Sequence, residues 1–208
     1  MTTQTHHIAV AGNIGAGKTT LVTKLSQQFN WTAHFESVED NPYLSDFYTD
    51  MKKWAFPLQI YFLHSRFNQV VAIRQSEKTI IQDRTIFEDA HIFAKNLSDS
   101  GYLDERDFQN YFSLFESMSK QVSQPDLLIY LRASVPTLIK HIATRGRDYE
   151  SGISIKYLED LNRHYEDWIA IYPGRKLIIN VDETDYVNRD EDLSHVFQRV
   201  QGELYGLF

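Results

Sequence analysis

The chain has 208 residues, of which 42% are hydrophobic and 24% are charged, and its formal net charge is -7. This composition is typical of a globular protein, and we expect one domain over residues 1–208. The negative charge argues against general nucleic-acid binding, the lack of cysteine excludes disulfides, and no apolar stretch reaches the roughly 20 residues that cross a bilayer. Residues 1–7 lack the basic start and apolar core of a signal peptide, so we expect a cytoplasmic protein without a membrane partner.

Short apolar runs alternate with helix-length segments along most of the chain, which is an α/β pattern. The pattern predicts a five-stranded parallel sheet covered by helices on both faces, with ligands at the carboxyl ends of the strands. Pro57 and Pro136 are expected in the first turns of their helices. The expected strands are 8–11, 33–35, 79–82, 127–131 and 177–181, and the expected helices are about 17–28, 43–50, 56–75, 87–96, 104–121, 135–145, 155–171 and 190–205.

Residues 12–19 (GNIGAGKT) fit the phosphate-binding loop G-x-x-x-x-G-K-[ST], and they lie between the first expected strand and the first expected helix. The glycines let backbone N–H groups surround a polyphosphate, and the helix N-terminus favours its negative charge. Lys18 can reach the β and γ oxygens, and the Thr19 hydroxyl is placed for Mg²⁺. The loop therefore indicates a bound nucleoside triphosphate. The expected phosphate-binding residues are Gly12, Asn13, Ile14, Gly15, Ala16, Gly17, Lys18, Thr19 and Thr20.

Acidic residues follow the second and third expected strands. Glu36 is placed where a carboxylate can accept a proton from an attacking hydroxyl group, although a solvated loop glutamate would give the same pattern. After the third strand, Asp83 can hold Mg²⁺ or its waters while Arg84 faces phosphate or a base. The alternative for this pair is a surface ion pair or a helix cap.

Two helical segments carry polar side chains at spacings that suit a nucleobase pocket. Gln59 and Arg66 are seven residues apart, which returns them to one face, and a carboxamide can pair twice with a base edge. A solvent-facing stripe is the alternative. Asp89 and Phe93 share a face and suit a heterocycle, or else Phe93 packs in the core while Asp89 caps the helix.

A basic turn at Arg145, Gly146 and Arg147 is expected to form a lid over about 145–154. Arginines that reach a transferring phosphoryl group are a frequent solution to phosphoryl transfer, and Gly146 permits a hinge. A solvated charged loop would have the same composition.

In this order the motifs resemble the deoxyribonucleoside kinase family along nearly the whole chain. Residues 36–44 (ESVEDNPYL) are similar to the E-P-V-x-x-N-P-Y-L stretch of its bacterial deoxyadenosine/deoxyguanosine kinase branch. The resemblance implies a P-loop kinase fold with a short arginine-rich lid, and a homodimer that uses ATP and Mg²⁺ to phosphorylate the 5′-hydroxyl of a deoxyribonucleoside for nucleotide salvage. Members that prefer thymidine usually carry smaller or apolar residues in place of Arg66 and Asp89. Deoxyadenosine is therefore expected first as acceptor, then deoxyguanosine or deoxycytidine.

The resemblance also implies roles for individual residues. Two positions depart from the family pattern, because Ser37 replaces a proline and His141 replaces a basic residue. The implied catalytic residues are Glu36 as the base, Arg84, Lys18 and Arg145. The implied nucleoside contacts are Glu36, Tyr43, Gln59, Arg66, Arg84, Asp89, Phe93 and Glu150, with Thr19 and Asp83 at the metal. Arg145 and Arg147 would hold phosphates, and Asp185 and Tyr186 belong to a segment that resembles the loop over the donor adenine.

Two other functions remain compatible with a phosphate-binding loop. A thymidylate-kinase-like nucleoside monophosphate kinase shares the fold, but Glu36 would repel a phosphorylated acceptor. A non-catalytic nucleotide sensor is the second, although the chain lacks the N-K-x-D and D-x-x-G patterns of a guanine-nucleotide switch. The aromatic residues Tyr111, Phe112 and Phe115 form either a dimer face or ordinary core.

Overall fold

The computed structural model describes residues 5–35, 41–147, 150 and 152–206. In this part of the chain five strands form one parallel sheet in the order β2-β3-β1-β4-β5, which confirms the predicted architecture. Each strand lies within about two residues of its expected position. The strands are β1 (His7–Gly12), β2 (Thr32–His34), β3 (Ile80–Asp83), β4 (Leu127–Arg132) and β5 (Lys176–Asn180).

The centre of the sheet is built from aliphatic residues that are buried on both faces. Ile8 in β1 pairs with Ile81 on one side and with Leu127 on the other, and all three are fully buried. Branched side chains suit a strand covered by helices on both faces. From β1 the chain builds first one side of the sheet and then the other, so a crevice opens at the carboxyl end of β1, where such sheets bind ligands.

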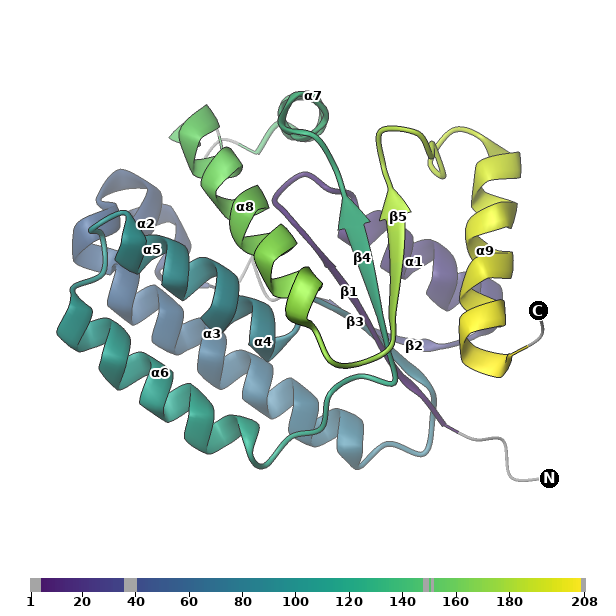
Figure 1. Cartoon of the computed structure of the whole chain (residues 1–208), viewed down its shortest axis with the longest axis horizontal. Coiled ribbons are helices and arrows are strands. Elements are labelled where there is room, and N and C mark those ends of the chain that lie inside the picture. The colour runs from purple at the N-terminus through teal and green to yellow at the C-terminus, as the bar shows by residue number, and fades with distance from the viewer. Residues whose placement is uncertain (1–4, 36–40, 148–149, 151, 207–208) are drawn as a thin grey trace.

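Helices cover both faces of this sheet (Figure 1). Two of them, the first and the last helix in the chain, lie on the right of the view, and most of the others lie on the left. The right-hand pair is α1 (Lys18–Phe29) and α9 (Asp190–Tyr205). The others are α2 (Leu44–Thr49), α3 (Met51–Arg74), α4 (Ile86–Glu88), π-helical η1 (Asp89–Ala94), α5 (Lys95–Asp99), α6 (Glu105–Ser119), α7 (Val135–Arg145) and α8 (Ile155–Ile171).

One helix start was predicted wrongly. Helix α3 begins at Met51, so Pro57 lies inside the helix and not in its first turn. The reason is a cap further upstream, because the Asp50 carboxylate accepts a hydrogen bond from the Lys53 backbone N–H at 3.1 Å. Since proline has no N–H, the Lys53 carbonyl lacks its usual helical donor. Pro136 does lie in the first turn of α7, as predicted.

The aromatic face of α6 belongs largely to the interior of the chain. Tyr111 is fully buried and Phe115 is 4% exposed, and both pack with Leu63 of α3 and Ile86 of α4. For these two aromatics the core interpretation is therefore the right one, while Phe112 lies at the edge of the cluster. In the described part of the chain no helix is both long and apolar enough to span a membrane.

Candidate active site

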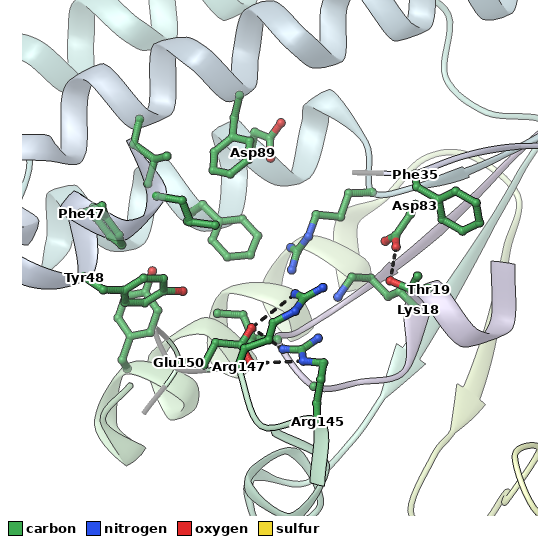
Figure 2. Close-up of a pocket in the computed structure, with 18 of the residues that line it drawn as sticks. Lys18, Thr19, Phe35, Phe47, Tyr48, Asp83, Asp89, Arg145, Arg147 and Glu150 are labelled. Carbon is green, nitrogen blue, oxygen red and sulfur yellow. Dashed lines mark hydrogen bonds and ion pairs between the residues drawn. The ribbon is translucent and has the colours of Figure 1, made fainter. Parts of the chain in front are cut away.

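A cavity of about 390 Å³ lies at the carboxyl edge of the sheet. Figure 2 shows Lys18, Thr19 and Asp83 at one end, Phe47 and Tyr48 at the other, and the lid residues below. The cavity thus has a charged end and an aromatic end. Of the residues predicted from the sequence it is lined by Ile14, Gly15, Lys18, Thr19, Gln59, Asp83, Arg84, Asp89, Phe93, Arg145, Arg147 and Glu150. Lining residues that the sequence did not single out are Phe35, Leu44, Phe47, Tyr48, Leu58, Phe62 and Tyr157.

The phosphate-binding loop is held from beneath by Tyr186. Its hydroxyl lies 3.3 Å from the carbonyl oxygen of Ala16 and 3.2 Å from that of Gly17, and the ring is 2% exposed. Gly17 has a φ of 91°, and a Cβ there would lie 2.3 Å from the Tyr186 hydroxyl oxygen, so this position requires glycine. Tyr186 therefore supports the loop, and its expected contact with the donor adenine stays a prediction.

Two further side chains tie the loop to neighbouring helices. Asn13 donates to the Leu158 carbonyl oxygen of α8 at 3.0 Å. His141 of α7 donates from Nδ1 to the Gly15 carbonyl oxygen at 2.8 Å, because a carbonyl can only accept. The departure at His141 thus has a structural role, in which the imidazole holds the loop in place. The Lys18 ammonium lies inside the loop, 2.8 Å from the Asn13 carbonyl oxygen.

Thr19 and Asp83 meet where a metal ion would be needed. The Thr19 hydroxyl donates to Asp83 Oδ2 at 2.6 Å, and Asp83 is 2% exposed. The other carboxylate oxygen, Oδ1, is buried and has no hydrogen-bond partner within the described residues. Over the same residues no group of three or more histidine and carboxylate side chains gathers around a point. Mg²⁺ is commonly bound by one or two protein oxygens together with water and phosphate, so this pair fits Mg²⁺.

Gln59 and Arg66 both point into the protein, which rules out the solvent-facing stripe. Gln59 is 2% exposed, lines the cavity, and its Oε1 has no hydrogen-bond partner among the described residues. Arg66 is 1% exposed and does not line the cavity. Its Nε lies 3.4 Å from Asp89 Oδ2, and its NH1 donates to the Asp83 carbonyl oxygen at 3.1 Å. Arg66 therefore orients the Asp89 carboxylate from a position outside the lining of the cavity.

Asp89 and Phe93 lie together on the π-helical turn η1, a structure that is often found at functional sites. The helix cap is formed by Thr85 and Glu88, so Asp89 is not the cap. Phe93 lines the cavity, and the Arg84 guanidinium carbon lies 4.4 Å from its ring centroid. The predicted stacking of Phe93 on a nucleobase is compatible with this position but stays a prediction.

Arg84 is held by two residues that the sequence analysis missed. Its NH1 donates to the Tyr165 hydroxyl at 3.0 Å, and that hydroxyl donates to Glu88 Oε1 at 2.9 Å. Burial raises the pKa of Glu88, while the charges of Arg84 and Lys18 act in the opposite direction. The capping-box spacing from Thr85 to Glu88 is a signal that was available in the sequence. Nothing comparable marks Tyr165, which is one of several buried residues on α8.

The lid residues pair with one another (Figure 2). Arg145 Nε donates to Glu150 Oε2 at 3.2 Å, and Arg147 NH1 lies 3.6 Å from Glu150 Oε1. Glu150 is 5% exposed, and its side chain lines the cavity together with those of Arg145 and Arg147. The solvated-loop alternative is therefore wrong for Glu150, while Arg145 and Arg147 line the cavity with partly exposed side chains. The contacts of all three with phosphates and a sugar hydroxyl stay predictions.

Some predicted site residues lie elsewhere or cannot be placed. Tyr43 packs its ring against Trp54 at 5.9 Å between centroids and does not line the cavity. Asp185 accepts from the Asn188 side-chain amide at 3.1 Å and from the Asn188 backbone N–H at 3.0 Å, and these hydrogen bonds lower its pKa. Glu36 lies outside the described residues. Its neighbour Phe35 lines the cavity.

Comparison with known proteins places this geometry among kinases. A family model described as deoxynucleoside kinase matches residues 8–204. The chain is 42% identical over 185 residues to the deoxyadenosine kinase of Dictyostelium discoideum, covering 89% of this chain and 75% of that protein. It is 34% identical over 201 residues to the deoxyadenosine/deoxycytidine kinase of Bacillus subtilis (strain 168), covering 95% and 93%. The structure of deoxyadenosine kinase from M. mycoides with bound dATP matches with a TM-score of 0.84 at 31% identity, covering 94% of this chain and 99% of that one.

Proposed function

The chain belongs to the deoxynucleoside kinase family, and from this premise we propose that it transfers the γ-phosphoryl group of ATP to the 5′-hydroxyl of deoxyadenosine. Deoxyguanosine and deoxycytidine are proposed as secondary acceptors. One observation supports this choice above the others. Gln59 and Asp89 line the cavity, and both present buried side-chain oxygens to whatever base enters.

The base preference follows from the hydrogen-bonding groups of the bases. The 6-amino group of adenine carries two hydrogens, which Gln59 Oε1 and the Asp89 carboxylate can accept. Thymine has no amino group, and its one N–H donor, at N3, lies between two carbonyl oxygens, so it cannot supply hydrogens to both acceptors. A site built to hydrogen-bond its substrate rejects an analogue without the matching group by up to about 10⁴–10⁵-fold. The named substrates of the Bacillus subtilis relative, deoxyadenosine and deoxycytidine, both carry an exocyclic amino group.

The charged end of the cavity suits the phosphates of the donor. Backbone N–H groups of the loop and the Lys18 ammonium would bind the β and γ phosphates, and Arg84 would face the group in transfer. Arg145 and Arg147 now share Glu150, so we infer that they turn toward phosphate when the donor binds and release the carboxylate for the sugar. The protein's contribution is therefore positioning and charge neutralisation.

Mg²⁺ is part of the proposal as the partner of ATP. Thr19 and Asp83 would hold it, and this is supported by Asp83 Oδ1, which has no hydrogen-bond partner in the part of the chain that the structure describes. When bound, the ion supplies positive charge for the β and γ phosphates.

We assign the general base to Glu36, on the strength of the family motif alone. Replacing it by glutamine keeps the shape but removes the proton acceptor, so Glu36→Gln is expected to lower kcat by about 10²-fold or more while deoxyadenosine still binds. Glu39→Gln, three residues further on, is the matched control and should keep kcat within about twofold. An unchanged kcat in Glu36→Gln would remove Glu36 from the mechanism.

Family membership argues against the two rival functions. A nucleoside monophosphate kinase would need positive charge next to the acceptor phosphate, whereas the expected base Glu36 is negative and would repel that phosphate. A non-catalytic sensor is at odds with relatives that are named as kinases over 89% and 95% of this chain.

A homodimer remains part of the proposal. Leu114 on α6 is 44% exposed, which leaves a large apolar side chain of this helix open to a second copy. Leu114→Asp should shift the mass measured by sedimentation toward the monomer if a second copy packs against it. The cytoplasmic location expected from the sequence is kept within the same proposal.

A further inference from the structure

Tyr165 links Arg84 to a buried carboxylate that no motif assigned. Its hydroxyl oxygen lies 3.0 Å from Arg84 NH1 and 2.9 Å from Glu88 Oε1, and the side chain is fully buried. An arginine can only donate, so the hydroxyl accepts from Arg84. Its single hydrogen is then directed to Glu88. Burial raises the pKa of Tyr165, so the hydroxyl keeps that hydrogen.

Glu88 is itself fixed at both carboxylate oxygens. Oε2 accepts from the Thr85 backbone N–H at 2.8 Å and lies 3.2 Å from the Thr85 hydroxyl. Oε1 lies 3.4 Å from the backbone N–H of Gly12, the first residue of the phosphate-binding loop. Glu88 is fully buried, so these contacts are not weakened by water. The carboxylate therefore joins the start of the loop to the segment that carries Arg84.

Arg84 has a backbone conformation that needs such support. Its φ is 69°, in the left-handed region that a side chain with a Cβ rarely adopts, and such residues cost about 1–3 kcal/mol. They persist where the surroundings over-determine them, and they gather at functional sites. Here the guanidinium lies between the Phe93 ring on one side and the Tyr165 hydroxyl at its NH1 end. Its direction is thus set by contacts on two different helices.

The Tyr165 ring is also fixed in place. It stacks on Tyr130 of β4 with ring centroids 5.7 Å apart and an interplanar angle of 17°. Tyr130 directs its own hydroxyl away from this network, to Glu166 Oε1 at 3.0 Å. The two neighbouring tyrosines are both buried and differ in what their hydroxyls bind.

We propose that Tyr165 and Glu88 are positioning residues that aim the Arg84 guanidinium at the phosphoryl group in transfer. The proposal rests on the role proposed for Arg84, and it adds a requirement: the arginine works only while the Tyr165 hydroxyl accepts from it. Neither residue lines the cavity. Their effect must therefore appear in kcat and must pass through Arg84.

The test is Tyr165→Phe, which removes one hydroxyl and keeps the ring. We expect kcat for deoxyadenosine to fall about tenfold or more, with both KM values within about threefold, because a misdirected donor weakens transition-state charge stabilisation more than ground-state binding. Glu88→Gln should give a similar loss, since a carboxamide cannot accept at both positions. Tyr130→Phe makes the same chemical change on the stacked ring and should keep kcat within about twofold.

Arg84→Ala, alone and with Tyr165→Phe, separates positioning from a general structural effect. Arg84→Ala is expected to lower kcat by about 10²-fold or more, and adding Tyr165→Phe should cause no further loss beyond about twofold. A second full loss in the Arg84→Ala background, or equal losses in Tyr165→Phe and Tyr130→Phe, would overturn the proposal. If Arg84→Ala keeps full kcat, the role proposed for Arg84 is wrong and the positioning proposal falls with it. If only Tyr165→Phe and Glu88→Gln keep full kcat, the positioning proposal alone is wrong.

Discussion

Replacing Gln59 by leucine should make the protein more stable and less active. Gln59 Oε1 is buried without a hydrogen-bond partner in the described part of the chain, and such an oxygen costs about 1–3 kcal/mol. Leucine has a similar size and no polar atom. We therefore expect the free energy of unfolding to rise by about 1 kcal/mol, which raises Tm by about 2–4 °C for a chain of this length. Binding sites commonly sacrifice stability in this way.

The activity of the same variant should move in the opposite direction. Deoxyadenosine loses the carboxamide that pairs with its base edge, and an amino hydrogen of the bound base is left without an acceptor. A loss of about 3 kcal/mol in transition-state binding corresponds to about 10²-fold in kcat/KM. The assays are a thermal melt followed by circular dichroism and initial rates of ATP-dependent phosphorylation of deoxyadenosine.

Gln82→Leu is the matched control, because Gln82 is fully buried and both ends of its amide are bonded. Its Oε1 lies 3.0 Å from His7 Nε2, and its Nε2 donates to Gln69 Oε1 at 3.1 Å. Removing this amide should lower stability by about 1–3 kcal/mol. The reasoning is refuted if Gln59→Leu lowers Tm as Gln82→Leu does, or if Gln59→Leu keeps full kcat/KM for deoxyadenosine.

Two further predictions concern the phosphate-binding loop and the pH dependence of stability. Gly17→Ala would place a Cβ 2.3 Å from the Tyr186 hydroxyl, so binding of a fluorescent ATP analogue should be lost. Adding Tyr186→Phe to the same chain removes that hydroxyl and should restore part of the binding. Full binding by Gly17→Ala alone would show that the contact is unimportant. Burial lowers the pKa of His7 from its ordinary 6.5, so the unfolded chain takes up the proton first. This stabilisation is present above pH 6.5 and is lost as the pH falls from there through the lowered pKa. The fall in Tm between pH 7.5 and pH 5.5 should therefore be smaller in His7→Gln than in the unmodified chain. His195→Gln is the control at an exposed position on α9 and should leave the fall as it is. An unchanged fall in His7→Gln would contradict the assignment of this pH dependence to His7.

Most of the fold could be predicted from local sequence patterns. The phosphate-binding loop and the apolar strands are recognisable from neighbouring residues alone, and both occur where predicted. The seven-residue spacing of Gln59 and Arg66 predicted a shared face, but not that the face is buried or that Arg66 stands behind Asp89, because packing against β3 decides this. The start of α3 was predicted too far along the chain because Pro57 was expected in the first turn, while the N-cap at Asp50 was not recognised.

Contacts between distant parts of the chain could not be predicted. Tyr165 meets Glu88 across 77 residues, and no periodicity distinguishes its hydroxyl from other core positions. The hydroxyl of Tyr186 lies against a loop 169 residues earlier, a contact that its expected place near the donor base did not indicate. The role of Glu36 rests on sequence alone and is left to the kinetic test.

The central claim is that the cavity selects a deoxynucleoside through the acceptors of Gln59 and Asp89. It is tested most directly by comparing kcat/KM for ATP-dependent phosphorylation of deoxyadenosine, deoxyguanosine, deoxycytidine and thymidine, with dAMP and dTMP as control acceptors. We predict the highest value for deoxyadenosine, a value for thymidine lower by at least about 10³-fold, and no turnover of either monophosphate. A preference for thymidine would contradict the base-reading account, and turnover of the monophosphates alone would contradict the proposed reaction.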